Sequence, residues 1–260
     1  MFKYKIGPAL SLFLGIAMLF AICANAARWQ SWYCVRAKDN KQPMCDADMA
    51  YIENYGGYYI DHFHGDDNEE KRVYLTFDAG YENGNVEKIL DVMKEENVKG
   101  TFFVLGNLIE KNGDLVSRMA DEGHTVANHT FSHKNMTKVA SYEDFCAELQ
   151  RLEIAYKTLT GKEMAKYYRP PEGVFDERTM KFAHDAGYKT IFWSFAYADW
   201  DNEKQMDHGR AKAKIMENIH NGAVILLHPT SETNAAIIGD VIRELKSMGY
   251  SFGSMDELTK

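Results

Sequence analysis

The chain has 260 residues, of which 45% are hydrophobic and 26% charged, and its formal net charge is −8. That length and apolar content suffice for one large domain or two small ones. An acidic chain repels phosphate, so nucleic-acid binding is not expected.

Residues 1–26 have the pattern of a secretory signal peptide. Lys3 and Lys5 form a basic start, residues 9–22 are nearly all apolar, and residues 24–26 give a small-x-small cleavage pattern. We therefore expect a secreted or extracytoplasmic protein, whose formal charge falls from −8 to −10 when the two lysines are removed. The alternative is an uncleaved membrane anchor, although the apolar run is short for a span.

Three cysteines remain after this leader: Cys34, Cys45 and Cys146. An odd number without C-x-x-C spacing fits neither a zinc cluster nor a disulfide framework. Outside the cytoplasm, Cys34 and Cys45 could form a disulfide bond, and the sequence favours neither the bond nor two free thiols.

Residues 27–69 are interpreted as an N-terminal extension, rich in aromatic and polar loop residues, that drapes over the surface of the following domain. His62 and His64 lie here beside Asp61 and Asp66. A metal site is one interpretation of this cluster, but a solvated loop is favoured over it.

A regular pattern begins near residue 70 and continues to residue 260. β-rich runs predict strands at 73–77, 101–105, 125–128, 190–195 and 223–227, and amphipathic stretches predict helices at 86–93, 141–159, 176–186, 211–219 and 234–248. This alternation indicates one α/β domain with parallel strands, either a (β/α) barrel or a doubly wound sheet. In such folds the active site lies at the carboxyl ends of the strands.

Polar residues gather at those predicted ends. Asp78 closes the first strand, although a lone acid there is more often a turn or cap residue. His129 and His133 are spaced i, i+4, which suits a shared metal if the segment is helical, while a surface pair is an equal alternative. His124, at the start of its strand, is interpreted as structural.

Three further clusters follow the later strands. The turn RPPEG can hold the backbone N–H of Glu172 in place, and Arg169 can pair with a strand-end carboxylate. Asp199 and His228 are an acid and an imidazole, a pair that suits proton donation. Each cluster alone is weak, but together they offer a base, an electrophile and an acid, as amide hydrolysis requires.

Five motifs now stand in order: TFDAG, HTFSH, RPPEG, ADW and LLHP. With this set, residues 70–257 resemble the polysaccharide deacetylase (NodB-homology) family. Two longer blocks, LTFDAGYENG and NGAVILLHPTSETNAAIIGDVIRELKSMGYSF, are similar to its delta-lactam-biosynthetic de-N-acetylases. That subgroup removes the acetyl group from N-acetylmuramic acid in spore-cortex peptidoglycan.

The resemblance implies a distorted (β/α) barrel and a role for each matching residue. Asp78 would be the general base oriented by Arg169, and His228 the general acid tuned by Asp199. His129 and His133 would bind a divalent metal ion, with zinc expected. Substrate contacts would come from Pro171, the backbone N–H of Glu172, and Trp200 and Leu226 around the acetyl methyl group.

Two departures from the family pattern concern carboxylates. Ala79 stands where the family has a second Asp that completes the metal site, so two histidines alone should hold the metal more weakly. Glu82 is a weak candidate to replace that ligand. Ala196 stands where many relatives have another acid.

The resemblance implies peptidoglycan glycan strands as the partner, in the cell wall or spore envelope of a sporulating bacterium, and a monomer is expected. The leading hypothesis is de-N-acetylation of N-acetylmuramic acid on the way to the muramic lactam. The alternatives are an N-acetylglucosamine deacetylase and a non-catalytic glycan-binding descendant, which the two alanines would favour.

Overall fold

The computed structural model of the protein describes residues 29–260. The predicted leader, residues 1–26, lies outside the described residues. Within the described part, no helix is both long and apolar enough to cross a membrane.

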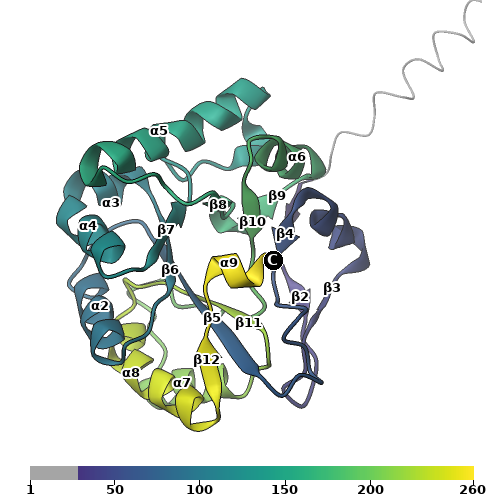
Figure 1. The fold of residues 1–260 in the computed structure, drawn as a ribbon, viewed down its shortest axis with the longest axis vertical. Coiled ribbons are helices and arrows are strands. Elements are labelled where there is room, and N and C mark those ends of the chain that lie inside the picture. Colours follow the sequence, from purple (N-terminus) through teal and green to yellow (C-terminus); the bar gives the residue numbers. More distant parts are fainter. Residues whose placement is uncertain (1–28) are drawn as a thin grey trace, which may run out of the picture.

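A curled sheet of parallel strands forms the centre of the molecule (Figure 1). Its order is β11 (Ala223–Leu227), β5 (Lys71–Ala79), β6 (Thr101–Val104), β7 (Thr125–Asn128), β8 (Tyr167–Tyr168), β10 (Lys189–Ile191) and β4 (Gly57–Tyr58), with β12 (Tyr250–Phe252) beside β5. Beyond β10 the chain meets β11 through a parallel bridge between Phe195 and Ile225, and Ile60 bridges Ala223. The sheet therefore curls back on itself as the predicted distorted (β/α) barrel.

Helices surround this sheet on its outer side (Figure 1). They are α2 (Val86–Glu95), α3 (Gly106–Lys111), α4 (Gly113–Asp121), α5 (Tyr142–Thr160), α6 (Glu177–Asp185), α7 (His208–Met216) and α8 (Glu232–Ser247). The five predicted helices are present, and Ser141 and Gly161 cap the two ends of α5. The prediction missed α3 and α4, which are short and are separated by the non-helical Asn112.

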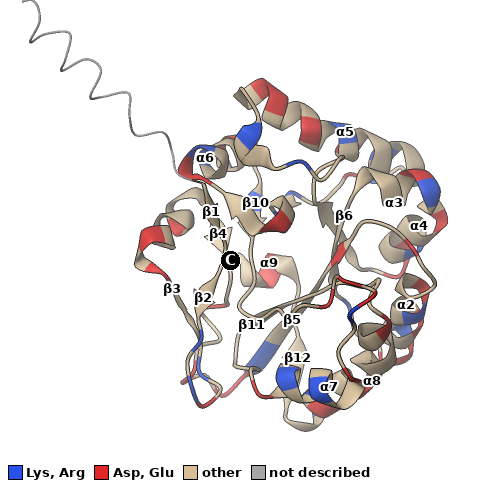
Figure 2. Ribbon diagram, turned by 180° about the vertical axis from the view of Figure 1, so that it is seen from behind, with Lys and Arg blue, Asp and Glu red and all other residues tan. Residues whose placement is uncertain are grey.

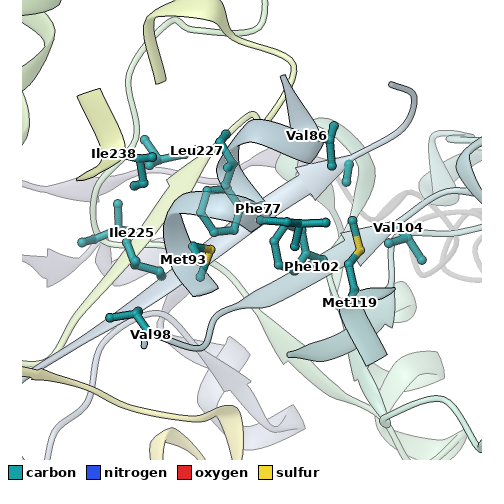
Figure 3. Packing of buried hydrophobic residues seen from close by; sticks show 14 of the residues in the cluster. Phe77, Val86, Met93, Val98, Phe102, Val104, Met119, Ile225, Leu227 and Ile238 are labelled. Atoms are coloured by element: carbon teal, nitrogen blue, oxygen red, sulfur yellow. The ribbon is translucent and has the colours of Figure 1, made fainter. Parts of the chain in front are cut away.

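Strand β5 divides its side chains between two environments. Val73, Leu75, Phe77 and Ala79 belong to the outer core between sheet and helices. There the Phe77 ring stacks on Phe102 with ring centroids 4.8 Å apart, among Met93, Leu227 and Ile238 (Figure 3). The alternate residues, Tyr74, Thr76 and Asp78, fall on the opposite face, toward the barrel interior, because side chains alternate along a strand.

The interior is filled at the amino ends of the strands. Tyr74 and Val224 pack there against Met255 and Leu258 of the short C-terminal helix α9 (Met255–Leu258). Figure 1 shows α9 lying across the middle of the barrel. This end of the barrel is therefore closed by apolar side chains.

Charged residues of both signs are spread over the outer helices (Figure 2). Arg118 on α4, for example, pairs with Asp91 at 2.6 Å and with Glu122 at 3.0 Å. Such partly exposed pairs contribute little to stability.

The N-terminal segment is part of the barrel and not a covering of its surface, which corrects the interpretation from sequence. Its strand β4 lies in the main sheet, and β1 (Gln30–Ser31) pairs with β9 (Val174–Phe175). Trp32, Ile52 and Tyr59 are buried with Phe192. The aromatic residues of this segment therefore build a second core, which the surface interpretation did not foresee.

The two cysteines of this segment face each other across a small hairpin. Residues Cys34 and Cys45 are directly opposite in the pairing of β2 (Cys34–Val35) with β3 (Met44–Cys45). Both are free thiols in the structure. Burial raises the pKa of each thiol to about 11.

The histidines near residue 62 have different environments. His62 is exposed, but His64 is buried, and its Nδ1 lies 2.5 Å from Asp61 Oδ2. Tyr74 also donates a hydrogen bond to Asp61. The solvated-loop interpretation is therefore wrong for His64, which belongs to a buried hydrogen-bonded group.

If the N-terminal segment is integral, replacing Trp32 should destabilise the whole domain. Its ring stacks on Phe192 at 4.4 Å and its Nε1 donates to the Trp193 carbonyl oxygen at 2.8 Å. We expect Trp32→Ala to lower the free energy of unfolding by about 3 kcal/mol, measured by urea denaturation. Trp29→Ala, which removes a 60% exposed ring three residues earlier, is the control. Equal small effects would mean that the segment is a dispensable covering.

Candidate active site

A cavity of about 730 Å³ opens at the carboxyl ends of the strands. It is lined by Asp78, Gly80, Tyr81, Leu105, His129, His133, Glu172, Gly173, Trp193, Ala196, Tyr197, Trp200, Leu226, His228 and Thr230. Residues from all five sequence motifs therefore meet in one place. Arg169 and Asp199 lie behind this lining, each buried against a lining residue.

Asp78 is held by a fully buried arginine. Arg169 Nη1 donates to Asp78 Oδ1 at 2.8 Å, and Nη2 donates to Thr76 Oγ1 at 2.9 Å. The Arg169 Nε donates to the Ile191 carbonyl oxygen at 3.0 Å, and the guanidinium lies 4.1 Å from the centre of the Phe103 ring. One carboxylate oxygen is thus engaged and the other, Oδ2, is directed to the histidine side of the cavity.

This pairing sets the charge of Asp78. Burial alone would raise the pKa of the carboxyl, because it disfavours the charged form. The adjacent Arg169 guanidinium outweighs burial and holds the pKa of Asp78 below its usual value. Asp78 is therefore ionised at neutral pH and able to accept a proton.

The segment that carries His129 and His133 is not helical. The spacing i, i+4 suggested a shared metal only if this segment were a helix, and that expectation of a helix is wrong. The segment follows β7 as an irregular loop in which Thr130 has φ 70° and His133 has φ 57°. The two imidazoles nevertheless converge, with ring centroids 5.1 Å apart. Two residues in the left-handed region, and not a helical turn, bring the rings together.

Hydrogen bonds from neighbouring elements stabilise this unusual loop. Asn128 Oδ1 accepts from the Thr130 N–H at 2.9 Å, and Thr130 Oγ1 accepts from the His133 N–H at 2.9 Å. Glu148, buried on α5, accepts from the Ser132 N–H at 2.6 Å. The supporting roles of Asn128 and Glu148 were not predicted, since neither lies in a recognisable site motif of its own.

The two histidines have the chemistry of metal ligands. His129 Nδ1 lies 2.9 Å from the Arg169 carbonyl oxygen, which can only accept, so this nitrogen carries the proton. Its Nε2 lies 3.5 Å from Asp78 Oδ2 and keeps its lone pair. Burial lowers the pKa of His129 to about 4 and also lowers that of His133, so both are neutral. Neutral imidazoles fit a divalent metal ion.

Neither Ala79 nor Glu82 provides a third protein ligand for a metal ion. Across residues 29–260, no cluster of three or more His, Cys, Asp or Glu side chains is arranged to hold a metal ion. Ala79 is packed in the outer core and does not line the cavity. Glu82 accepts from the Val86 N–H at 3.0 Å at the start of α2, so it is a helix cap and not a replacement ligand.

His228 stands on another side of the cavity and is held by Asp199. Its Nδ1 lies 2.7 Å from Asp199 Oδ1, and its backbone N–H donates to Asp199 Oδ2 at 2.8 Å. Asn234 Nδ2 donates to the same Oδ2 at 2.6 Å. These bonds orient the imidazole and leave Nε2 as the nitrogen available to a substrate.

The charge preference of His228 is opposite to that of His129. Burial alone would lower the pKa of His228, but the hydrogen bond and charge of Asp199 outweigh it. The pKa is therefore raised above its ordinary value, and this imidazole is suited to donate a proton.

The turn RPPEG shapes the rim near His133. Glu172 has φ 58° and its exposed side chain lines the cavity. Gly173 has φ 64°, and a Cβ there would come within 2.7 Å of Trp193. Pro171 is buried in the turn and is not a lining residue, so its position does not support direct contact with substrate.

The predicted apolar contacts, Leu226 and Trp200, both line the cavity. Leu226 is buried, whereas Trp200 is 61% exposed and meets the His228 ring edge-on, with centroids 6.0 Å apart. Sequence interpretation missed Tyr81, Leu105, Trp193, Tyr197 and Thr230, which also line the cavity. Of these, Tyr81 lies in the quoted LTFDAGYENG block and Thr230 in the quoted block that begins NGAVILLHPT, so both blocks offered a signal.

Removing Arg169 should expose how strongly Asp78 depends on it. We expect Arg169→Met to lower the free energy of unfolding by about 3 kcal/mol at pH 7, because it leaves a buried carboxylate unpaired. Adding Asp78→Asn should recover part of that loss, since the unpaired charge is then gone. Urea denaturation measures both.

The surface variant Arg118→Met is the matched control for this experiment, with an expected loss below about 1 kcal/mol. If Asp78→Asn deepened the loss caused by Arg169→Met, the unpaired charge would not be its cause.

Comparison with known proteins agrees with this geometry. The family described as polysaccharide deacetylase matches residues 65–191. The chain is 38% identical to the peptidoglycan-N-acetylmuramic acid deacetylase PdaA of Bacillus subtilis, over 88% of this chain and 85% of PdaA.

Two solved structures share the fold. The structure of Bacillus subtilis PdaA, a family 4 carbohydrate esterase, superposes with a TM-score of 0.83 at 37% identity, covering 89% of this chain and 97% of PdaA. A family 4 carbohydrate esterase from Bacillus anthracis gives 0.72 at 37% identity, covering 89% and 96%. With its fold, its five motifs and their convergence on one cavity, the chain belongs to the polysaccharide deacetylase family.

Proposed function

We propose that this protein hydrolyses the N-acetyl group of N-acetylmuramic acid in peptidoglycan glycan strands. The observation that carries the proposal is that Asp78, kept ionised by Arg169, and His228, whose pKa Asp199 raises, line one cavity. Amide hydrolysis needs both a base and an acid, and here the environment gives each residue the charge its role requires.

The residues divide the reaction as follows. Asp78 Oδ2 accepts a proton from the attacking water, while Arg169 holds Oδ1 and keeps the carboxylate ionised. The oxygen of that water forms the new bond to the acetyl carbon, and the C–N bond breaks. His228 Nε2 donates a proton to the departing nitrogen, which leaves as the amine, and the acetyl group leaves as acetate. The Glu172 backbone N–H at the rim is the proposed donor to the amide oxygen.

His129 and His133 are the proposed ligands of a divalent metal ion, with zinc expected. When bound, such an ion supplies positive charge that stabilises the negative charge developing on the amide oxygen. Because the chain offers two imidazoles without the usual carboxylate, we expect weaker metal binding than at a site with three protein ligands.

The choice of N-acetylmuramic acid rests on the similarity to PdaA over most of both chains. Formation of muramic lactam in spore cortex, by closure of the new amine onto the lactyl carboxylate, rests on the two long sequence blocks alone. Export is proposed from the leader pattern of residues 1–26.

Acetate release from peptide-free glycan strands by residues 27–260 tests the function directly. We expect release that chelation abolishes and added zinc restores. Release that survives chelation would keep the enzyme but remove the metal role of His129 and His133. Strands whose muramic or glucosamine residues are already deacetylated would show which sugar is used.

Asp78→Asn distinguishes an enzyme from a glycan-binding descendant. In an enzyme it should remove turnover, by at least about 10³-fold, while the dissociation constant for the strands changes little. If folded wild-type protein binds strands but releases no acetate under any metal condition, the non-catalytic alternative is correct.

The pH profile should report His228. An acid catalyst must be protonated, so kcat/KM should fall as pH rises through the pKa of His228, which lies above the ordinary value of about 6.5. Asp199→Asn removes the charge that raises this pKa and leaves burial to lower it. The alkaline limb should then move to lower pH. An unmoved limb would exclude His228 as the titrating acid.

A further inference from the structure

An aromatic side chain at the cavity rim has no role in the reaction described above. The exposed aromatic residues in the described part of the chain are Trp29, Tyr33, Phe63, Tyr81 and Trp200. Only Tyr81 and Trp200 among them line the cavity. Tyr81 leaves 42% of its surface exposed there, so its ring is accessible to a molecule that enters the cavity.

The backbone beneath Tyr81 is held in place from two sides. Gly80 lets the chain pass close to Leu105, since a Cβ at Gly80 would come within 2.8 Å of Leu105 Cδ1. Asn107 Nδ2 donates to the Gly80 carbonyl oxygen at 2.9 Å. On the other side, Asn83 Nδ2 donates to the Thr230 carbonyl oxygen at 2.8 Å. The loop after β5 is therefore built to present its side chain at one position.

The Tyr81 side chain is oriented by a residue distant in sequence. Asn202 Nδ2 donates to Tyr81 Oη at 2.6 Å, although 121 positions separate them. Asn202 lies shortly after Trp200 in the chain, so this bond joins the two loops that carry the rim aromatics. The two rings therefore belong to neighbouring parts of the same rim.

We propose that Tyr81 is a sugar-binding residue, held by Asn202 as a positioning residue, and that it forms with Trp200 an aromatic subsite for pyranose rings. The apolar C–H face of a pyranose packs well on a flat ring, and a ring with restricted motion loses little entropy on binding. The subsite would hold the glycan strand while Asp78 and His228 act on the acetyl group. This inference rests on the proposed function, whose substrate it specifies further.

The test is a kinetic and binding series on the full mature chain with peptide-free glycan strands. Tyr81→Ala and Tyr81→Leu remove the flat ring, the second while keeping apolar bulk. Tyr81→Phe, Asn202→Ala and the double variant remove only the hydrogen bond. Tyr33→Ala is the matched control, because Tyr33 is also exposed and is bonded to Asp46 at 2.7 Å but lies outside the cavity.

Ring removal should raise KM about fivefold with kcat within about twofold, in both the Ala and the Leu variant. Tyr81→Phe and Asn202→Ala should each raise KM about twofold, and the double variant no further, because both break one bond. Tyr33→Ala should leave both constants unchanged. An unchanged KM in Tyr81→Ala and Tyr81→Leu, or a fall in kcat alone, would overturn the proposal.

Binding of the same strands, measured by tryptophan fluorescence in the Asp78→Asn background, separates this proposal from the proposed function. If the wild-type protein releases no acetate, the hydrolytic function fails, yet the dissociation constants still decide the role of Tyr81. A dissociation constant that Tyr81→Leu leaves unchanged would overturn the subsite, and weaker binding in Tyr81→Leu would support it.

Discussion

The permanently charged guanidinium of Arg169 lies fully buried in the middle of the barrel. The rest of the site depends on how the Asp78 carboxylate balances this charge. Arg169 joins three strands, since it follows β8 and contacts Asp78 and Thr76 on β5 and the carbonyl oxygen of Ile191 on β10. A buried charge pair is weak evidence for stability, because desolvation costs about as much as the pair returns. Its evident consequence here is chemical: Asp78 remains ionised in a place where burial would otherwise neutralise it.

The three histidines that line this cavity differ in the charge state that they favour. Burial keeps His129 and His133 neutral, as metal ligands must be, whereas the Asp199 carboxylate raises the pKa of His228 despite its burial. The difference lies in the partner of each ring. His129 faces a backbone carbonyl oxygen, which carries no net charge, and His228 faces a carboxylate that accepts from its Nδ1. One cavity thus contains an ionised carboxylate, an imidazole with a raised pKa and two neutral imidazoles without conflict.

The barrel that holds these groups is completed by its N-terminal segment. Strand β4 pairs with β10, and the following Ile60 bridges to Ala223 of β11, so the segment fills the gap between the two edges of the sheet. Trp32 connects this segment to the cavity wall, because its indole N–H donates to the carbonyl oxygen of Trp193, which lines the cavity. The wall of the site therefore rests on residues far from any motif.

Sequence alone determined the parallel α/β architecture and the positions of β5, β6, β7 and β11, but not of β8, which precedes RPPEG. The family resemblance implied the pairing of Asp78 with Arg169 and of Asp199 with His228, and the structure contains both contacts. These features follow from local periodicity and from motifs at strand ends, which parallel strands must bring to one edge. Tertiary structure alone decided the rest. The HTFSH loop takes left-handed φ values, and Glu148 of α5 accepts a hydrogen bond from its Ser132 N–H. Tyr81 accepts a hydrogen bond from Asn202, and the aromatic N-terminal segment enters the barrel. Each of these depends on tertiary contacts, most of them with partners far away in the chain, and no local pattern of residues records where such partners will lie.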